Sequence, residues 1–177
     1  MDQLFIGMLF ILFDFNLSLG GFTIGLLPDF VGYLLALAGL GKLAQESPIL
    51  SKCRTLAGVF AVYSLLSYGV NLFGLTANVF IIYIISLVEV ILRLYFIYQL
   101  VQGLKQLEIG RQIELYTEKL HKYWALMTAF QVFSLLLIMS LLLSAVCTVV
   151  SFVFSILFIL KLNMGRINWK NGMALYH

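Results

Sequence analysis

Glu89 and Arg93 are two ionisable residues inside an otherwise apolar stretch of the chain. Because they are four residues apart, both side chains share one face of a helix, and Ser86 continues that face. A charge at the centre of a membrane helix costs about 2.5–3.5 kcal/mol on the insertion scale. Such residues are retained as a mutually compensating pair that fixes packing, or as a solute, ion or proton site. The spacing is consistent with both.

Three further polar residues could belong to the same site. Asp14 and Asp29 lie near the ends of the first two apolar stretches, on a side where no Lys or Arg is expected. Carboxylates without basic neighbours would form an entrance that attracts cations. Alternatively, Asp29 caps its helix and Asp14 marks where the first helix meets water. Gln131 lies in the fifth apolar stretch, where a buried amide needs a partner such as Glu89 or Arg93.

Motifs for enzymatic chemistry are lacking in the sequence. The histidines, His121 and His177, cannot form a helical zinc pair, and no Gly-x-Ser-x-Gly or Cys-x-x-Cys sequence occurs. We therefore predict a non-enzyme with no catalytic residues, no metal, no cofactor and no nucleic-acid partner. Since no nucleotide-binding loop is present, active transport would need an ion gradient or a partner ATPase.

The composition indicates that the fold is surrounded by lipid and not by water. Hydrophobic residues make up 62% of the chain, charged residues 11%, and the mean hydropathy is +1.03. Soluble domains contain about a quarter charged residues. Lipid must cover the apolar surface that a fold of this size cannot bury. We predict an all-α, polytopic membrane protein.

The apolar stretches predict the helices. One transmembrane domain over 1–177 would contain six spans, at about 4–19, 29–45, 55–75, 78–101, 124–142 and 144–162. No charge occurs from Tyr123 to Leu160, which is too long for one crossing, so a turn is expected near Ser140–Ser144. The first helix either runs through Asp14 to about Leu19, or stops early so that 14–28 forms a partly re-entrant loop.

The basic residues predict the orientation. Apart from Arg93, they fall in three regions: Lys42, Lys52 and Arg54; Lys105, Arg111, Lys119 and Lys122; and Lys161, Arg166 and Lys170. The connections near 20–28, 72–77 and 140–144 contain none. By the positive-inside rule, the three basic regions and both termini are cytoplasmic.

A polar connection follows the fourth predicted span. Ile109, Ile113, Tyr116 and Leu120 recur at helical spacing, which predicts a cytoplasmic amphipathic helix at about 104–121. It would lie in the membrane interface or extend the fourth helix.

Small and hydroxyl residues form stripes at helical spacing on several predicted helices, which favours close helix packing in lipid. The stripes are Gly32 and Ala36; Ser64, Ser67, Tyr68 and Asn71; Thr128, Gln131 and Ser134; and Ser144, Thr148, Ser151 and Ser155.

Two resemblances accompany these patterns. The residues Leu27-Pro28-Asp29-Phe30-Val31-Gly32-Tyr33 resemble a segment of small uncharacterised bacterial multi-pass membrane proteins. In size, helix count and placement of the termini, the chain is similar to the substrate-binding membrane subunits of energy-coupling-factor vitamin transporters. The resemblance implies a cell-membrane protein of the bacterial inner membrane.

Together these features predict that the chain binds or transports a small cationic or polar solute inside a helical bundle. Glu89 and Arg93 would form the central site, with Gln131 and Ser86 beside them and Asp14 and Asp29 at the entrance. The alternative is a non-transporting structural or regulatory subunit. Its amphipathic helix would dock a membrane or cytoplasmic partner protein, or a second copy of the chain.

The orientation can be tested with reporter fusions after Lys42, near Gln112 and at the C-terminus. All three should read cytoplasmic, because the basic regions remain on that side. A periplasmic or extracellular signal at any of them would contradict the arrangement of six helices with both termini inside.

Overall fold

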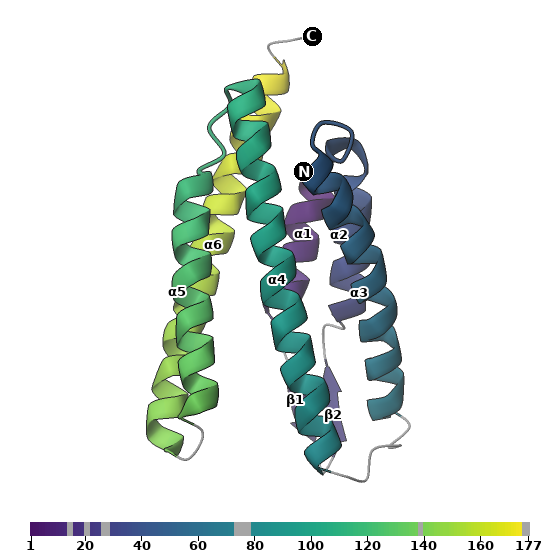
Figure 1. Cartoon of the computed structure of the whole chain (residues 1–177), viewed down its shortest axis with the longest axis vertical. Helices are drawn as coiled ribbons and strands as arrows, with labels where there is room; N and C mark the ends of the chain where they lie inside the picture. The colour runs from purple at the N-terminus through teal and green to yellow at the C-terminus, as the bar shows by residue number, and fades with distance from the viewer. Residues whose placement is uncertain (14–15, 20–21, 26–28, 73–78, 138–139, 175–177) are drawn as a thin grey trace. The chain divides into compact units, whose positions relative to one another are not determined.

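The computed structural model describes residues 1–13, 16–19, 22–25, 29–72, 79–137 and 140–174 (Figure 1). In these ranges the chain forms six α-helices and one short antiparallel hairpin, so the predicted helical class is confirmed. The elements are α1 (Asp2–Leu12), β1 (Asn16–Leu19), β2 (Phe22–Gly25), α2 (Asp29–Leu43), α3 (Pro48–Leu72), α4 (Val79–Arg111), α5 (Thr117–Leu136) and α6 (Leu141–Ala174).

The chain divides into two compact units, where we predicted a single domain. Unit 1 comprises Met1–Leu100 and unit 2 comprises Val101–His177. The boundary falls inside α4, so this helix contributes its first part to unit 1 and its last turns to unit 2.

The first helix is shorter than the favoured prediction. It ends at Leu12 rather than near residue 19, and the following residues pair as a hairpin in which Asn16 faces Gly25 and Leu19 faces Phe22. Asn and Asp compete with helical backbone hydrogen bonds, and a Gly-Gly sequence between strands favours a tight turn. The early stop is therefore correct; Asp14 lies outside the described residues.

Three of the other helices extend beyond the predicted spans at their polar ends, whereas α2 and α5 end before residues 45 and 142. Helix α3 begins at Pro48 rather than residue 55, α4 continues to Arg111, and α6 runs to Ala174 rather than residue 162. Hydropathy marks the lipid-facing part of a helix, whereas backbone hydrogen bonding continues into polar sequence. Since α5 ends at Leu136 and α6 begins at Leu141, the long apolar run divides into two helices as predicted, but the break comes before the predicted turn at Ser140–Ser144.

The predicted amphipathic helix at about 104–121 is not continuous: its first part extends the fourth helix to Arg111, as one of the two alternatives held, and the helix is broken before Thr117. Helix α4 ends at Arg111, α5 begins at Thr117, and Gln112 and Tyr116 have positive φ values of 53° and 59°. The four apolar positions therefore do not share one helical face. Ile113 and Leu120 are buried, whereas Ile109 is 70% exposed.

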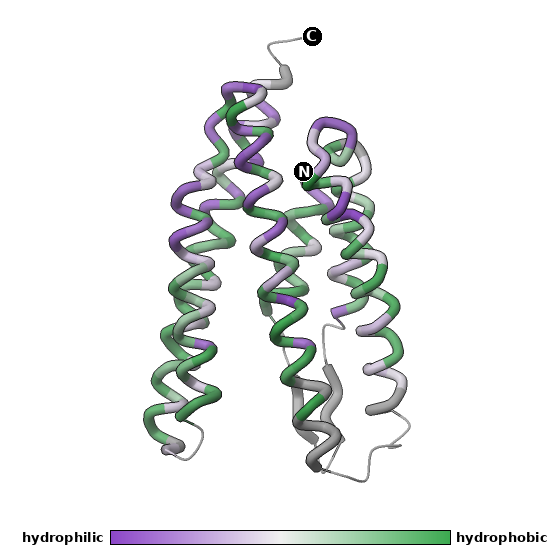
Figure 2. The backbone as a smooth tube through the Cα atoms, in the orientation of Figure 1, coloured by the Kyte–Doolittle hydropathy of each residue, from purple (hydrophilic) through white to green (hydrophobic). Residues whose placement is uncertain are grey.

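Three of the described helices are long and apolar enough to cross a membrane (Figure 2). Their candidate spans are Pro48–Gly69, Leu87–Arg111 and Leu142–Gly172, and shorter apolar helices cover Asp2–Leu12 and Asp29–Gly41. Helix α6 also exposes an apolar stripe at helical spacing, which is typical of a lipid-facing surface. It consists of Leu142, Val146, Val149, Val153, Ile156 and Leu160.

Small residues bring the backbones of α1 and α2 together in unit 1. A Cβ added at Gly7 would lie 2.6 Å from the Gly32 carbonyl oxygen and 2.7 Å from the Ala36 nitrogen. The predicted close contact at Gly32 and Ala36 is therefore confirmed. Beside it, the rings of Tyr33, Phe60 and Phe96 meet edge to face, with centroids 5.5–6.3 Å apart.

Hydroxyl residues join α5 and α6 in unit 2. The Ser134 Oγ lies 3.0 Å from the Ser144 Oγ and 2.8 Å from the Thr148 Oγ1. Farther along, Ser151 Oγ donates to the Met127 carbonyl oxygen at 3.2 Å. The packing role predicted for the stripe on α6 is confirmed, and on α5 it is confirmed for Ser134.

The contact at Gly7 can be tested by adding one methyl group. We expect Gly7→Ala to lower stability in detergent by about 1–3 kcal/mol, as overpacking does, because the Cβ meets backbone atoms of α2. Gly41→Ala is the matched control: a Cβ there meets nothing within 4 Å. A thermal transition unchanged by Gly7→Ala would contradict the close approach of the two helices.

Candidate functional site

Glu89 is held by a hydroxyl group from a neighbouring helix. Ser67 Oγ on α3 donates to Glu89 Oε1 on α4 at 2.5 Å. Ser67 is buried and Glu89 is half-buried. The length is that of a strong hydrogen bond to a carboxylate, so this contact fixes the side chain and joins α3 to α4.

Arg93 contacts a different part of unit 1. Its Nη1 donates to the Ile11 carbonyl oxygen at 3.4 Å. Ile11 is in the last turn of α1, where the carbonyl groups have no partner within the helix and the helix dipole is negative. The guanidinium group therefore supplies both a donor and a favourable charge to the broken end of α1.

The two charged residues do not act as the predicted pair. They lie on one face of α4, but no ion pair joins Glu89 to Arg93 among the residues that the structure describes. Their partners belong to two different helices, α3 and α1. Sequence spacing places both on one face; it does not specify which neighbouring element each side chain reaches.

Two tyrosines belong to the helices of unit 1 beside this site. Tyr63 precedes Ser67 by one helical turn on α3, and Tyr33 is buried on α2. Neither tyrosine was predicted as a site residue, whereas Ser67 belongs to the polar stripe that the sequence predicts on the third helix.

The position of this polar cluster along α4 follows from helix geometry. Glu89 comes ten residues after Val79, the first residue of α4. At about 1.5 Å per residue this is roughly 15 Å along the helix. Figure 2 shows hydrophilic positions of α4 among hydrophobic ones.

The other predicted site residues are more widely distributed. Asp29 begins α2, and Ser86 lies on α4 one turn before Glu89, with its side chain outside the described residues. Gln131 is half-buried on α5, in unit 2. The polar cluster of unit 1 is thus formed by Ser67, Glu89 and Arg93, with the two tyrosines nearby.

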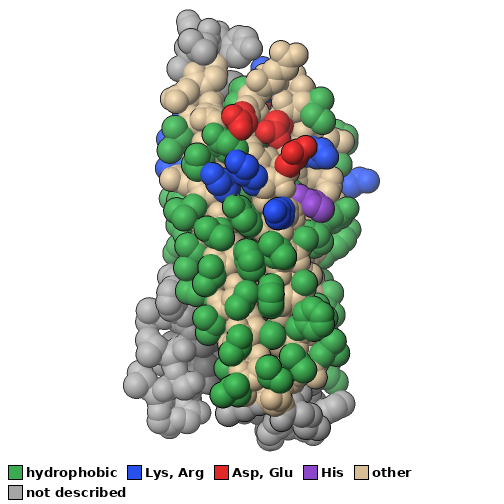
Figure 3. Space-filling model, turned by 90° about the vertical axis from the view of Figure 1, so that its left-hand side faces the viewer, with side chains coloured by type: hydrophobic (Ala, Val, Ile, Leu, Met, Phe, Trp, Pro, Cys, Tyr) green, Lys and Arg blue, Asp and Glu red, His purple; other side chains and the backbone are tan. Residues whose placement is uncertain are grey.

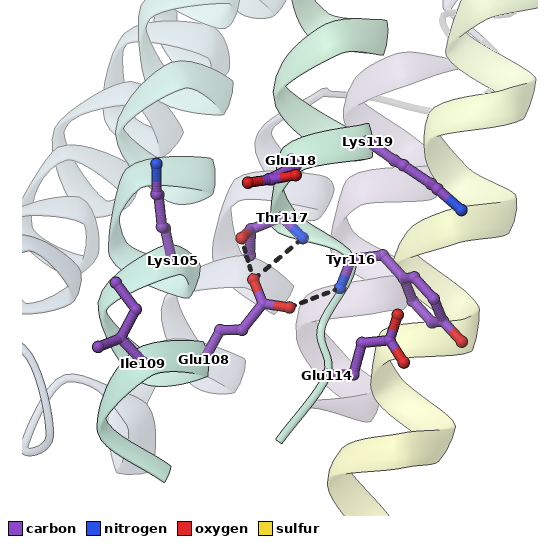
Figure 4. Close-up of a pocket in the computed structure, with 8 residues that line it drawn as sticks. All are labelled: Lys105, Glu108, Ile109, Glu114, Tyr116, Thr117, Glu118 and Lys119. Atoms are coloured by element: carbon purple, nitrogen blue, oxygen red, sulfur yellow. Dashed lines mark hydrogen bonds between the residues drawn. The ribbon is translucent and has the colours of Figure 1, made fainter. Parts of the chain in front are cut away.

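A second polar region occurs in unit 2, where α4 is connected to α5. It is a pocket of about 370 Å³ (Figure 4). Its lining residues are Lys105, Glu108, Ile109, Glu114, Tyr116, Thr117, Glu118 and Lys119.

Glu108 in this pocket has a structural role. Its carboxylate accepts the backbone N–H groups of Leu115, Tyr116 and Thr117 at 2.8, 3.1 and 3.2 Å, and it also accepts the Thr117 hydroxyl. These contacts cap the first turn of α5, whose leading N–H groups have no helical partner. Sequence reasoning missed this cap because Glu108 belongs to the preceding helix.

No known family model, curated protein or solved structure matches this chain. Among the described residues, no group of three or more His, Cys, Asp or Glu side chains could hold a metal ion. The resemblances of the sequence to membrane proteins stay predictions.

The separate partners can be tested by double-mutant cycles on the stability of the protein in detergent. We expect Ser67→Ala and Glu89→Leu to couple by about 1–3 kcal/mol, as hydrogen-bonded groups do, because leucine offers no acceptor. Glu89→Gln and Arg93→Met should couple by no more than about 0.5 kcal/mol, the size of an ordinary helical i,i+4 pair. A larger coupling energy between Glu89 and Arg93 than between Ser67 and Glu89 would contradict the separate partners and support an ion pair.

Proposed function

We propose that this chain is a multi-pass membrane protein that binds a small cationic solute at Glu89. In this proposal the remaining apolar helices also cross the bilayer, six in total, and both termini are cytoplasmic. The cluster of Ser67, Glu89 and Tyr63 in unit 1 is the binding site.

The observation that carries the proposal is the neutral partner of Glu89. A carboxylate offers about four acceptor positions, and the contact at Glu89 Oε1 comes from the uncharged Ser67 hydroxyl. The cation one turn away, Arg93, donates instead to the Ile11 carbonyl oxygen. An ionised carboxylate at membrane depth is costly unless a positive charge compensates it. A bound cation would supply that charge.

The surrounding groups favour a cation over an anion. The oxygen atoms of Ser67 and Glu89 are suitable ligands for a hard cation or an ammonium group. In this proposal Tyr63, one helical turn before Ser67 on α3, adds an aromatic ring, which attracts a cation by about 0.5–2 kcal/mol where the cation lies within about 6 Å of the ring centroid. The same carboxylate would repel an anion.

The broken first helix supports movement of a solute as well as binding. Non-helical backbone is stable at membrane depth only where protein covers it or where it lines a water-filled cavity. In many transporters, interrupted helices form the substrate site near the bilayer midplane. Here the end of α1 is tied to Arg93, one turn from Glu89. A displacement of α1 would therefore reach the proposed site directly.

One argument for the alternative function, a non-transporting docking subunit, is weakened. It depended on an amphipathic helix with a free apolar face, whereas Ile113 and Leu120 are buried within unit 2. We therefore favour solute binding.

The proposal predicts that cations stabilise the protein through Glu89. In detergent, a titration with sodium, potassium, methylammonium and tetramethylammonium chlorides at constant ionic strength should raise the thermal transition for at least one cation. A ligand at ten times its Kd stabilises by about 1.4 kcal/mol. Glu89→Gln should abolish the shift, because the amide keeps the shape of the side chain and removes its charge.

The matched control is Glu114→Gln, which removes an exposed carboxylate from unit 2 and should leave the shift intact. A shift that survives Glu89→Gln, or no shift with any of the four cations, would contradict the proposed site.

A further inference from the structure

Two lysines from different helices converge on the ring of Tyr116. The Lys119 Nζ on α5 lies 5.6 Å from the ring centroid, and the Lys161 Nζ on α6 lies 5.2 Å from it. Tyr116 directly precedes α5 and has a left-handed backbone conformation, with φ 59° and ψ 32°. Such a conformation is costly for a residue other than glycine. The contact of its N–H with Glu108 holds it in place.

The positive charges of this cluster form no ion pair. Within the described part of the chain, neither Lys119 nor Lys161 forms an ion pair with a carboxylate, and the further contact of Lys161 is with Met164 Sδ at 3.3 Å. The ring of Tyr116 attracts each ammonium group but carries no net charge. An anion bound beside the ring would compensate both charges.

The neighbouring carboxylates do not fill that position. Glu108 is engaged in capping α5, and Glu114 and Glu118 line the adjacent pocket as exposed side chains (Figure 4).

The cluster lies where a lipid headgroup would be. The exposed apolar stripe of α6 runs from Leu142 to Leu160, and Lys161 follows it immediately. Eighteen steps of about 1.5 Å span roughly 27 Å, close to the thickness of the hydrocarbon core. On this side of the molecule, Figure 3 shows Lys and Arg side chains in a band between the hydrophobic surface and the acidic side chains.

We propose that Lys119, Lys161 and the Tyr116 ring form a binding site for the phosphate of an anionic phospholipid, with its acyl chains along the apolar stripe of α6. Basic sites between membrane helices on the cytoplasmic side bind such headgroups. The lipid phosphate would link the start of α5 to α6. This site is independent of Glu89 and of the solute proposed there.

The test is native mass spectrometry of the full chain in detergent, titrated with phosphatidylglycerol or phosphatidylcholine. The anionic lipid should bind more tightly, and Lys119→Ala and Lys161→Ala should each weaken it roughly fivefold, since a basic residue near an anionic surface contributes about 1 kcal/mol. Lys161→Arg, unlike Lys161→Ala, should keep the affinity for phosphatidylglycerol, because the guanidinium group also binds phosphate. Circular dichroism and thermal transitions would verify that each variant folds.

The matched control is Lys52→Ala, which removes an exposed lysine from α3 in unit 1. It should leave the affinity for phosphatidylglycerol unchanged. An equal loss in Lys52→Ala would show attraction to net charge alone and overturn the site, as would equal affinities for the two lipids. If inorganic phosphate displaced phosphatidylglycerol at similar concentrations, the site would bind free phosphate, and the proposal that it binds a lipid would be wrong.

Discussion

A backbone carbonyl group at the end of a helix needs a donor from outside the helix, and the end of α1 shows how unit 1 supplies one. Helix α1 stops at Leu12; the Phe13 N–H closes the helix on the Leu9 carbonyl oxygen, which leaves the carbonyl groups after Leu9 without helical donors. Arg93 donates to one of them, at Ile11. That contact joins α4 to the end of α1, while Glu89, one turn away on the same helix, accepts from Ser67 on α3.

Packing and polarity cooperate in unit 1. The close backbone approach of α1 and α2 at Gly7 and Gly32 fixes the position of α1, and the hydrogen bond from Ser67 to Glu89 fixes α3 against α4. The α1–α2 contact and the α3–α4 hydrogen bond thus position the carboxylate of Glu89, whose hydrogen-bond donor is a neutral hydroxyl group. We infer that this combination serves a cation. In unit 2 we propose the opposite charge arrangement, in which Lys119 and Lys161 beside the Tyr116 ring bind an anion.

Much of the helical content could be predicted from the sequence, because long apolar runs separated by polar residues admit few other structures in lipid. The placement of Glu89 and Arg93 on one face also followed from spacing. Their partners did not, since Ser67 and Ile11 are distant in sequence and belong to separate helices. The break before α5 was missed because Gln112 and Tyr116 adopt positive φ without a glycine. It depends on Glu108, whose capping role exists only once the chain has folded back.

The most direct measurement of the central claim is infrared difference spectroscopy of the protein in lipid, with isotope-labelled glutamate. On addition of the stabilising cation, the carboxyl bands should show one glutamate changing from the protonated acid, or from one carboxylate environment, to a cation-bound carboxylate. This difference signal should be absent in Glu89→Gln. A spectrum in which no glutamate band responds, or in which the response persists in Glu89→Gln, would contradict binding of a cation at Glu89.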